Sequence, residues 1–243
     1  MKRIKVGLFG ASGKMGQAIQ DSLNEARNKI HWQNFLAVAK DQIKGFDLSV
    51  PHLENIENEV LAEVNVWVDF SSDKGLKSLI KKTERYKTPI VTGTTGLSSK
   101  DFSDLKKQSK KRPIFWASNM SPGLWAFRQA LKSFQYISNF DFAVDEIHHN
   151  QKKDKPSGTA LTLHKDLEKI LEKTIPLPEA HRLGAVFGIH NVYAVSNSEI
   201  IHFQHQALSR KVFSQGALDA ARWLINKKSG LYSMDDLFLS KKK

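Results

Sequence analysis

The sequence of 243 residues contains no cysteine. This absence excludes disulfide bonds and thiolate metal ligands, and with them the disulfide-stapled class of secreted proteins. There is also no uninterrupted apolar run near the roughly 20 residues that a membrane-spanning helix needs. The first residues, Met-Lys-Arg, enter a strand pattern without the apolar core or cleavage site of a signal peptide. We therefore expect a cytoplasmic protein.

Acidic residues are few relative to basic ones, 25 against 37, which gives a net charge of +12. An excess of this size raises the question of nucleic-acid binding. However, the lysines are spread along the chain in short runs, and none forms a basic helix with interleaved aromatic residues. We therefore expect no nucleic-acid partner and attribute the charge to attraction for small polyanions, such as a phosphorylated cofactor and a dicarboxylate.

A glycine-rich turn follows the first apolar strand directly. The strand is predicted over 4–9, the turn G-A-S-G-K-M-G covers 10–16, and a helix pattern with one apolar face follows. Strand, glycine turn and helix together favour a dinucleotide site, because glycine lets the backbone approach a pyrophosphate and the helix N-terminus stabilises its charge. The spacing is G-x-x-G-x-x-G rather than the commoner G-x-G-x-x-G.

Further strands alternate with helices through the first half of the chain. They are predicted over 35–39, 64–70, 89–92 and 113–116. This alternation predicts an α/β fold with a Rossmann-like, doubly wound parallel sheet. Ligands bind such sheets at the carboxyl ends of the strands, where the turns 10–16, 70–72, 93–96 and 118–121 would lie. For each turn alone, ordinary turn chemistry is the alternative.

The end of the second strand bears on cofactor choice. An acidic residue there favours a free ribose 2′-hydroxyl, and a basic residue favours a 2′-phosphate. Lys40, together with Lys14 in the glycine turn, slightly favours NADPH, whereas the adjacent Asp41 could serve a ribose hydroxyl. A solvated Lys40 is the alternative.

The most distinctive stretch is D-E-I-H-H-N-Q-K-K-D-K-P-S-G-T-A at 145–160. It lies between an apolar strand pattern that begins at Phe140 and a helix pattern over 159–173. The backbone N–H groups of Gly158 and Thr159 and the helix dipole can hold an anion such as a carboxylate. His148, His149 and Lys152 can give a proton to a substrate. A solvated basic loop that ends in an ordinary helix cap is the alternative reading.

The rest of the chain predicts a second α+β domain with a mixed, largely antiparallel sheet. A helix is expected over 122–134, an irregular segment over 176–181, strands over 185–195 and 199–208, and a helix over 212–225 that returns to the first domain. The predicted domains are therefore 1–120 with 211–243, for the dinucleotide, and 121–210, for substrate binding and oligomerisation. His190, His202 and His205 lack metal-ligand spacing, so we expect structural or surface roles and no metal site.

Taken together, these motifs resemble those of the dihydrodipicolinate (4-hydroxy-tetrahydrodipicolinate) reductase family. The similarity covers nearly the whole chain, and the pattern H-H-x-x-K-x-D-x-P-S-G-T-A is its most specific part. The other motifs are G-A-S-G-K-M-G, V-D-F-S-S, G-T-T-G, S-N-M-S-P-G, S-R-K-V-F-S-Q-G-A-L and G-L-Y-S-M-D-D. The resemblance implies an oxidoreductase of diaminopimelate and lysine biosynthesis that reduces 4-hydroxy-tetrahydrodipicolinate to tetrahydrodipicolinate with NADPH or NADH, as a homotetramer.

The resemblance also implies roles for individual residues. His148 becomes the general acid/base and Lys152 the proton donor, with substrate carboxylates held by His149, Gly158 and Thr159 and a further contact from Arg210. The implied dinucleotide contacts are Gly10, Ala11, Ser12, Gly13, Lys14, Met15, Lys40, Asp41, Gly93, Thr94, Thr95, Ser118, Asn119, Met120 and Ser121.

The chain departs from the family pattern in two places. Lys40 stands where related enzymes often have an acidic residue. The family's R-x-G-D-I-V-G-E-H-T reads R-L-G-A-V-F-G-I-H-N here, in a segment shorter than expected, so that acids are absent at Ala185 and Ile189. This segment normally supports the sheet and the subunit contacts.

Two other functions fit the dinucleotide half. One is a reductase for another small dicarboxylate or imine, such as an amino-acid dehydrogenase, which need not carry H-H-x-x-K together with P-S-G-T. The other is a non-catalytic nucleotide-sensing module, which has no need of His148 and Lys152 as proton donors.

Overall fold

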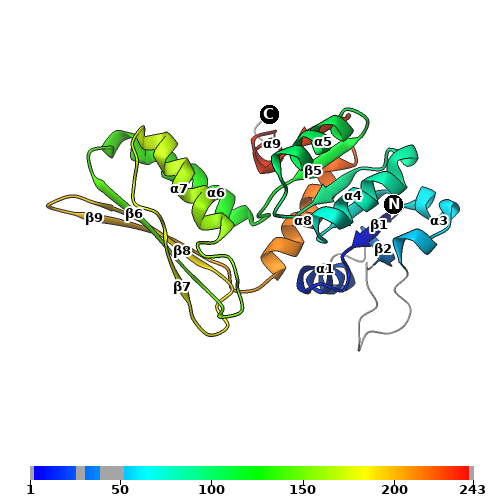
Figure 1. Ribbon diagram of the computed structural model, residues 1–243, viewed down its shortest axis with the longest axis horizontal. Helices are drawn as coiled ribbons and strands as arrows, with labels where there is room; N and C mark the ends of the chain where they lie inside the picture. Colours follow the sequence, from blue (N-terminus) through cyan, green and yellow to red (C-terminus); the bar gives the residue numbers. More distant parts are fainter. Residues whose placement is uncertain (1–2, 26–30, 39–51, 241–243) are drawn as a thin grey trace. The chain divides into compact units, whose positions relative to one another are not determined.

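The computed structural model describes residues 3–25, 31–38 and 52–240, and the ribbon in Figure 1 follows them. Contacts between Cα atoms divide the chain into two units. Unit 1 comprises Met1–Met120 and Phe213–Lys243, and unit 2 comprises Ser121–Val212. Across the described ranges, the helices are all too short or too polar to cross a membrane.

Unit 1 is built on a six-stranded sheet in the order β10-β5-β4-β3-β1-β2, and every pair of neighbours is parallel. Its strands are β1 (Ile4–Phe9), β2 (Trp32–Val38), β3 (Val66–Asp69), β4 (Ile90–Thr92), β5 (Pro113–Trp116) and β10 (Gly230–Tyr232). The predicted doubly wound parallel sheet is confirmed. Its central strands are apolar on both faces because helices cover both, and Val66, Trp67 and Val68 have no exposed surface.

Helices alternate with these strands along the chain (Figure 1). They are α1 (Lys14–Asn24), α3 (Asn58–Glu63), α4 (Asp73–Thr83), α5 (Ser99–Ser109), α8 (Lys211–Leu224) and α9 (Met234–Leu239), with 3-10 turns at Leu53–Asn55 and Glu84–Tyr86. Local chemistry sets their starts. Ser98 and Asp101 form a reciprocal capping box at α5, and the Ser72 hydroxyl accepts the Gly75 N–H at α4.

Unit 2 is a four-stranded mixed sheet in the order β7-β6-β8-β9 with helices packed on one face (Figure 1). Its strands are β6 (Asp141–His148), β7 (Glu179–Arg182), β8 (Ile189–Val195) and β9 (Ile200–Gln206), and its helices are α6 (Pro122–Ala130), a 3-10 segment (Leu131–Ile137) and α7 (Gly158–Leu171). β6, β8 and β9 pair antiparallel, whereas β7 joins β6 in parallel. Alternate strand residues such as Phe142, Val144 and Val192 share a core with Leu163 and Leu167 of α7.

The structure corrects three predicted boundaries in unit 2. The segment predicted as irregular over 176–181 contains the strand β7, whose residues Glu179 and His181 give it no apolar alternation to detect. The strand predicted from residue 185 begins at Ile189, because Gly184 has a φ of 49° and turns the chain first. The helix predicted over 122–134 ends at Ala130 and tightens into the 3-10 segment.

Candidate functional site

The four turns predicted to lie at a ligand-binding edge follow neighbouring strands of the parallel sheet, and three of them carry predicted dinucleotide contacts. β5, β4, β3 and β1 lie side by side in that order, so the segments after their carboxyl ends meet at one edge. This is the edge at which doubly wound sheets bind ligands. Lys40 and Asp41, which were predicted to lie near the ribose, fall outside the described residues.

The turn after β1 brings backbone close to backbone. Gly10 has a φ of 82°, and a Cβ atom there would lie 2.6 Å from the Phe70 carbonyl oxygen. The N–H groups of Gly10 and Ala11 donate to the Val38 carbonyl at 3.0 and 3.1 Å. A side chain at Gly16 would collide with the Gly10 carbonyl, so glycine lets α1 start against β1. The turn and the start of α1 therefore have the close packing that a pyrophosphate-binding turn requires.

Asp69 ties together the turns after β3 and β4. Its buried carboxylate accepts hydrogen bonds from the hydroxyls of Ser71, Thr92 and Thr94 at 2.5, 2.6 and 2.8 Å. Burial raises the pKa of Asp69, and the hydroxyl donors counter part of that rise. The Thr94 hydroxyl is thus engaged inside the protein, and Gly93 and Thr95 are the more open residues of the turn.

The motif after β5 spans the boundary between the units. Ser118 is exposed, Asn119 is half-buried and Met120 is buried, all in unit 1. Ser121 belongs to unit 2, where its hydroxyl accepts the Leu124 N–H at 3.1 Å and caps α6. In the turn after β1, Ser12 and Met15 are half-buried, and Gly13 and Lys14 are exposed.

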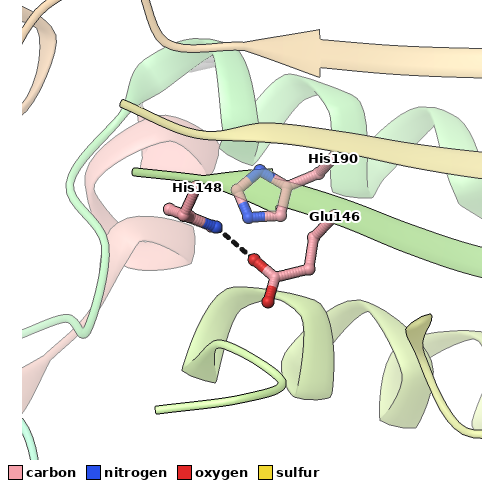
Figure 2. Close-up of side chains that lie close together, drawn as sticks. All are labelled: Glu146, His148 and His190. Atoms are coloured by element: carbon pink, nitrogen blue, oxygen red, sulfur yellow. Dashed lines mark ion pairs between the residues drawn. The ribbon is translucent and has the colours of Figure 1, made fainter. Parts of the chain in front are cut away.

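In unit 2, β6 carries Glu146 and His148 on the face that packs against the helices. Strand side chains alternate between faces, so residues two apart share one. Glu146 is fully buried and His148 is 8% exposed. The Glu146 carboxylate forms an ion pair with His148 Nδ1, as the dashed line in Figure 2 marks.

The other carboxylate oxygen of Glu146 reaches two further groups. It accepts the Ser157 backbone N–H at 2.9 Å and the Arg182 guanidinium at 3.0 Å. Burial alone would raise the pKa of Glu146. Contacts with His148, Ser157 and Arg182 outweigh burial and hold this pKa at about 2. Glu146 is therefore ionised across the physiological range.

The loop between β6 and α7 carries Lys152. Its ammonium lies 2.8 Å from the Asp154 carboxylate. Burial would raise the pKa of Asp154, but Lys152 and the Gly158 backbone N–H lower it on balance. Arg182 donates to the carbonyl oxygens of Lys152 and Asp154 at 3.3 and 2.5 Å. The loop is thus fastened to β7 through one guanidinium.

The predicted anion site lies at the start of α7. The Ser157 hydroxyl caps the helix by accepting the Ala160 N–H at 3.2 Å. Gly158 is exposed, and a Cβ atom placed on it meets no heavy atom within 4 Å, so there is open space beside the first residue of the helix. Thr159, the next residue, is half-buried. The arrangement offers a carboxylate-sized anion a helix N-terminus close along the chain to Lys152.

The structure brings the other predicted substrate contacts to unit 2 as well. His149 is half-buried beside His148 at the end of β6. Arg210 stacks its guanidinium over the Phe187 ring at 5.1 Å, and Phe187 adjoins Gly188. A Cβ atom on Gly188 would lie 2.9 Å from His148 Nε2. Arg210 is thereby placed at the same end of the sheet as His148.

A row of imidazoles continues from His148 across the sheet. The rings of His148 and His190 are 5.1 Å apart, and those of His190 and His205 are 6.0 Å apart. Burial, then the neighbouring positive charges, lower the pKa of His190 to about 3, so this imidazole is neutral. Ligand atoms of Glu146, His148 and His190 all lie within 4.8 Å of one another (Figure 2).

The sequence patterns alone do not single out Glu146, Arg182 or His190. A period of two places Glu146 on the same face as His148, which is a usable signal for the ion pair. Arg182 and His190 come from strands β7 and β8, and only the register of the sheet brings both beside Glu146. The expectation of a structural role for His190 omitted its contact with the predicted acid/base.

Comparisons with known proteins cover the chain almost completely. The family model "Dihydrodipicolinate reductase, N-terminus" matches residues 4–120, and "Dihydrodipicolinate reductase, C-terminus" matches residues 124–238. A 4-hydroxy-tetrahydrodipicolinate reductase of Bdellovibrio bacteriovorus is 44% identical over 243 residues, with both chains fully covered. One of Clostridium novyi is 37% identical, covering 98% of this chain and 99% of that one. The solved structure "Dipicolinate bound Dihydrodipicolinate reductase from Paenisporosarcina sp. TG-14" has the same fold, with a TM-score of 0.77, 17% identity and coverage of 98% and 100%.

Proposed function

The chain belongs to the dihydrodipicolinate reductase family, and we propose that it reduces 4-hydroxy-tetrahydrodipicolinate to tetrahydrodipicolinate with a nicotinamide dinucleotide, in diaminopimelate and lysine biosynthesis. The observation that carries this proposal is the arrangement at the end of β6. There His148, Lys152 and the N-terminus of α7 lie on one short segment, fastened by Glu146 and Arg182. A dicarboxylate substrate needs both features, fixed donors for its carboxylates and groups that deliver a proton.

The glycine turn of unit 1 fits a dinucleotide. Gly10 and Gly16 occupy positions where any side chain would strike backbone, and α1 begins between them, at Lys14. Asp69 holds the neighbouring turns through three hydroxyls. We propose that these turns bind the dinucleotide through the residues around Gly10–Met15, Gly93–Thr95 and Ser118–Ser121. When bound, the nicotinamide supplies the hydride.

The residues of unit 2 then handle charge and protons. In the proposed mechanism, the substrate carboxylates bind the N–H groups of Gly158 and Thr159, with His149 and Arg210 as further donors. The product lacks the substrate's hydroxyl, which leaves as water and yields a conjugated imine. Addition of a hydride to that imine builds negative charge, so one proton is taken up for each hydride. Lys152 gives this proton and His148 serves as general acid/base.

For the cofactor we propose a preference for NADPH, supported by Lys40 and Lys14. Lys40→Glu should weaken NADPH binding more than NADH binding, because a carboxylate repels a 2′-phosphate. The two dissociation constants, measured by fluorescence titration, check this. An unchanged ratio of the constants would refute the role of Lys40.

We also propose a homo-oligomer, a tetramer by family resemblance, assembled through the face of the second sheet that the helices leave uncovered. That face is already ordered by side-chain contacts. The Tyr193 and His202 rings stack at 4.5 Å, and Asn191 bonds to Asp145 and His202 at 2.6 and 2.9 Å. Light scattering on the purified protein checks the assembly, and a monomer at micromolar concentration would contradict it.

The direct test supplies the substrate in situ. Dihydrodipicolinate synthase, pyruvate and aspartate semialdehyde are mixed with the protein, and oxidation of NADPH and of NADH is followed by absorbance in parallel. We expect rapid oxidation that depends on the synthase and that dipicolinate, added as a planar dicarboxylate probe, slows competitively. Tight NADPH binding without oxidation of either cofactor would point instead to a different substrate or to a binding role.

A further inference from the structure

Glu146 contacts three parts of the candidate site through one buried carboxylate. One oxygen faces His148 Nδ1 in the ion pair of Figure 2. The other accepts the Ser157 N–H, which belongs to the turn that opens α7, and the guanidinium of Arg182. The carboxylate therefore joins the proposed acid/base to the proposed anion site.

Building on the reductase function proposed above, we propose that Glu146 is a positioning residue that selects the reactive nitrogen of His148. A neutral imidazole carries one N–H, and a carboxylate can only accept. Because Glu146 accepts from Nδ1–H, Nε2 becomes the atom that takes and gives the proton of the reaction. The same carboxylate stabilises the imidazolium whenever Nε2 is protonated.

The surroundings of Nε2 agree with this assignment. A side chain on Gly188 would lie 2.9 Å from Nε2, so glycine leaves space at this nitrogen. His148 itself is only 8% exposed, which leaves few directions from which a substrate can reach it. The nearby residues Ala185 and Ile189 are uncharged, and Glu146 is the buried carboxylate in contact with the ring.

The charged and titratable groups that face Glu146 and His148 come from three elements. Arg182 approaches from β7, the neutral His190 from β8, and Lys152 with Asp154 from the loop before α7. The Arg182 guanidinium, 3.0 Å from the Glu146 carboxylate, offsets its charge. Of the two imidazoles, His148 is the one in contact with the carboxylate, so it is the ring that Glu146 positions.

Arg182 connects Glu146 to the loop that carries Lys152, the second proposed proton donor. Its guanidinium bonds to Glu146 and to the carbonyl oxygens of Lys152 and Asp154. His148 and Lys152 are therefore both positioned by one buried ion pair, although they are contributed by a strand and a loop. A shift of that pair would move both donors.

A divalent metal is the competing occupant for this cluster. Glu146, His148 and His190 offer one carboxylate and two imidazoles, a ligand set that zinc accepts. Arg182 and the Ser157 N–H already offset the carboxylate charge, however, and a cation there would face the guanidinium. The structure therefore favours a proton between Glu146 and His148.

The test compares Glu146→Gln with the wild-type enzyme in the synthase-coupled assay. The glutamine carbonyl can still accept from Ser157 and Arg182, but its NH2 group meets Nδ1 and forces the N–H onto Nε2. We expect kcat at neutral pH to fall about 100-fold, with the substrate KM and the NADPH Kd within threefold. The deficit should shrink as the pH is lowered, because acid restores the imidazolium without help from the carboxylate.

Three matched measurements distinguish a positioning role of Glu146 from a purely structural role. Asp166→Asn breaks the Arg128–Asp166 ion pair between α6 and α7 in the same unit and should leave the pH profile unchanged. Arg182→Lys keeps the charge but cannot make all the bonds of the guanidinium, so it should raise the substrate KM while preserving the shape of the kcat profile. Chelator-treated wild-type enzyme should keep full activity.

Different outcomes refute the positioning role of Glu146 and the proposed reductase function. Wild-type kcat in Glu146→Gln, or a deficit equal at all pH values, overturns the positioning role, as does loss of activity on chelation. If His148→Gln is inactive at the same time, the reductase proposal stands and only this inference fails. Full turnover by His148→Gln overturns the assignment of His148 itself.

Discussion

Replacing His190 with glutamine is expected to flatten the acid dependence of folding stability. The His190 side chain is 3% exposed, and burial, then nearby positive charge, lower its pKa from an ordinary 6.5 to about 3. In mild acid, His190 therefore binds a proton in the unfolded chain but not in the folded chain. A lowered folded-state pKa makes this contribution to stability complete above pH 6.5 and progressively lost as the pH falls towards 3.

The magnitude follows from the two pKa values. At pH 5 the unfolded imidazole is almost fully protonated and the folded one is not, so stability falls by slightly more than about 1 kcal/mol per pH unit. Between pH 7 and pH 5 the loss from this group amounts to about 2 kcal/mol, and over the whole interval to about 5 kcal/mol. Glutamine does not titrate, so the variant should lack this share of the loss.

Urea unfolding at pH 7, 6 and 5, followed by far-ultraviolet circular dichroism, measures the effect. The informative quantity is the difference between pH values for each protein, because glutamine also changes packing at every pH. His181→Gln, on the exposed side of β7, is the matched control and should leave the dependence as in wild type. Parallel curves for wild type and His190→Gln would refute the reasoning that buries His190 as a neutral group.

Two further substitutions test the packing around each half of the site. Gly188→Ala should lower kcat about tenfold at unchanged NADPH affinity, because the new methyl group displaces the His148 ring. Gly123→Ala, whose Cβ finds ordinary contacts beyond 3.5 Å, is the control in the same steady-state assay. Equal rates for both variants would contradict the close approach of Gly188 to the His148 ring. Asp69→Asn should destabilise unit 1 by about 2–3 kcal/mol and weaken NADPH binding, because the amide NH2 would face hydroxyls that donate to the carboxylate in the wild type. Thermal unfolding measures the stability, and fluorescence titration measures the NADPH affinity. An unchanged NADPH affinity would show that Asp69 does not support dinucleotide binding.

The fold of unit 1 could be predicted because its signals are local. Apolar strands such as β1 and β5 end in glycine or serine turns and are followed by helices with one apolar face. Short stretches of sequence therefore suffice to predict the type and order of these elements. β10 was harder to predict, because a three-residue strand near the end of the chain has no pattern of its own and exists by pairing with β5. β7 shares this property. It is short and polar, and β6 supplies its hydrogen bonds.

The candidate site divides in the same way. The turn that opens α7 could be predicted from Pro-Ser-Gly-Thr before a helical pattern, because capping chemistry is local. Arg182 and His190 could not, because they reach Glu146 across strands whose register depends on the whole sheet. The lowered pKa of His190 likewise arises from burial, which no single stretch of sequence contains.

The most direct test of the account is turnover and NADPH binding by His148→Gln and Lys152→Met. Proton delivery is proposed for the loop and strand end of unit 2, and dinucleotide binding for the turns of unit 1. Synthase-coupled assays at saturating substrate should show kcat reduced at least about 100-fold in each variant, while fluorescence titration gives an NADPH Kd within twofold of wild type. Undiminished turnover in either variant, or loss of NADPH binding in both, would contradict this division of roles.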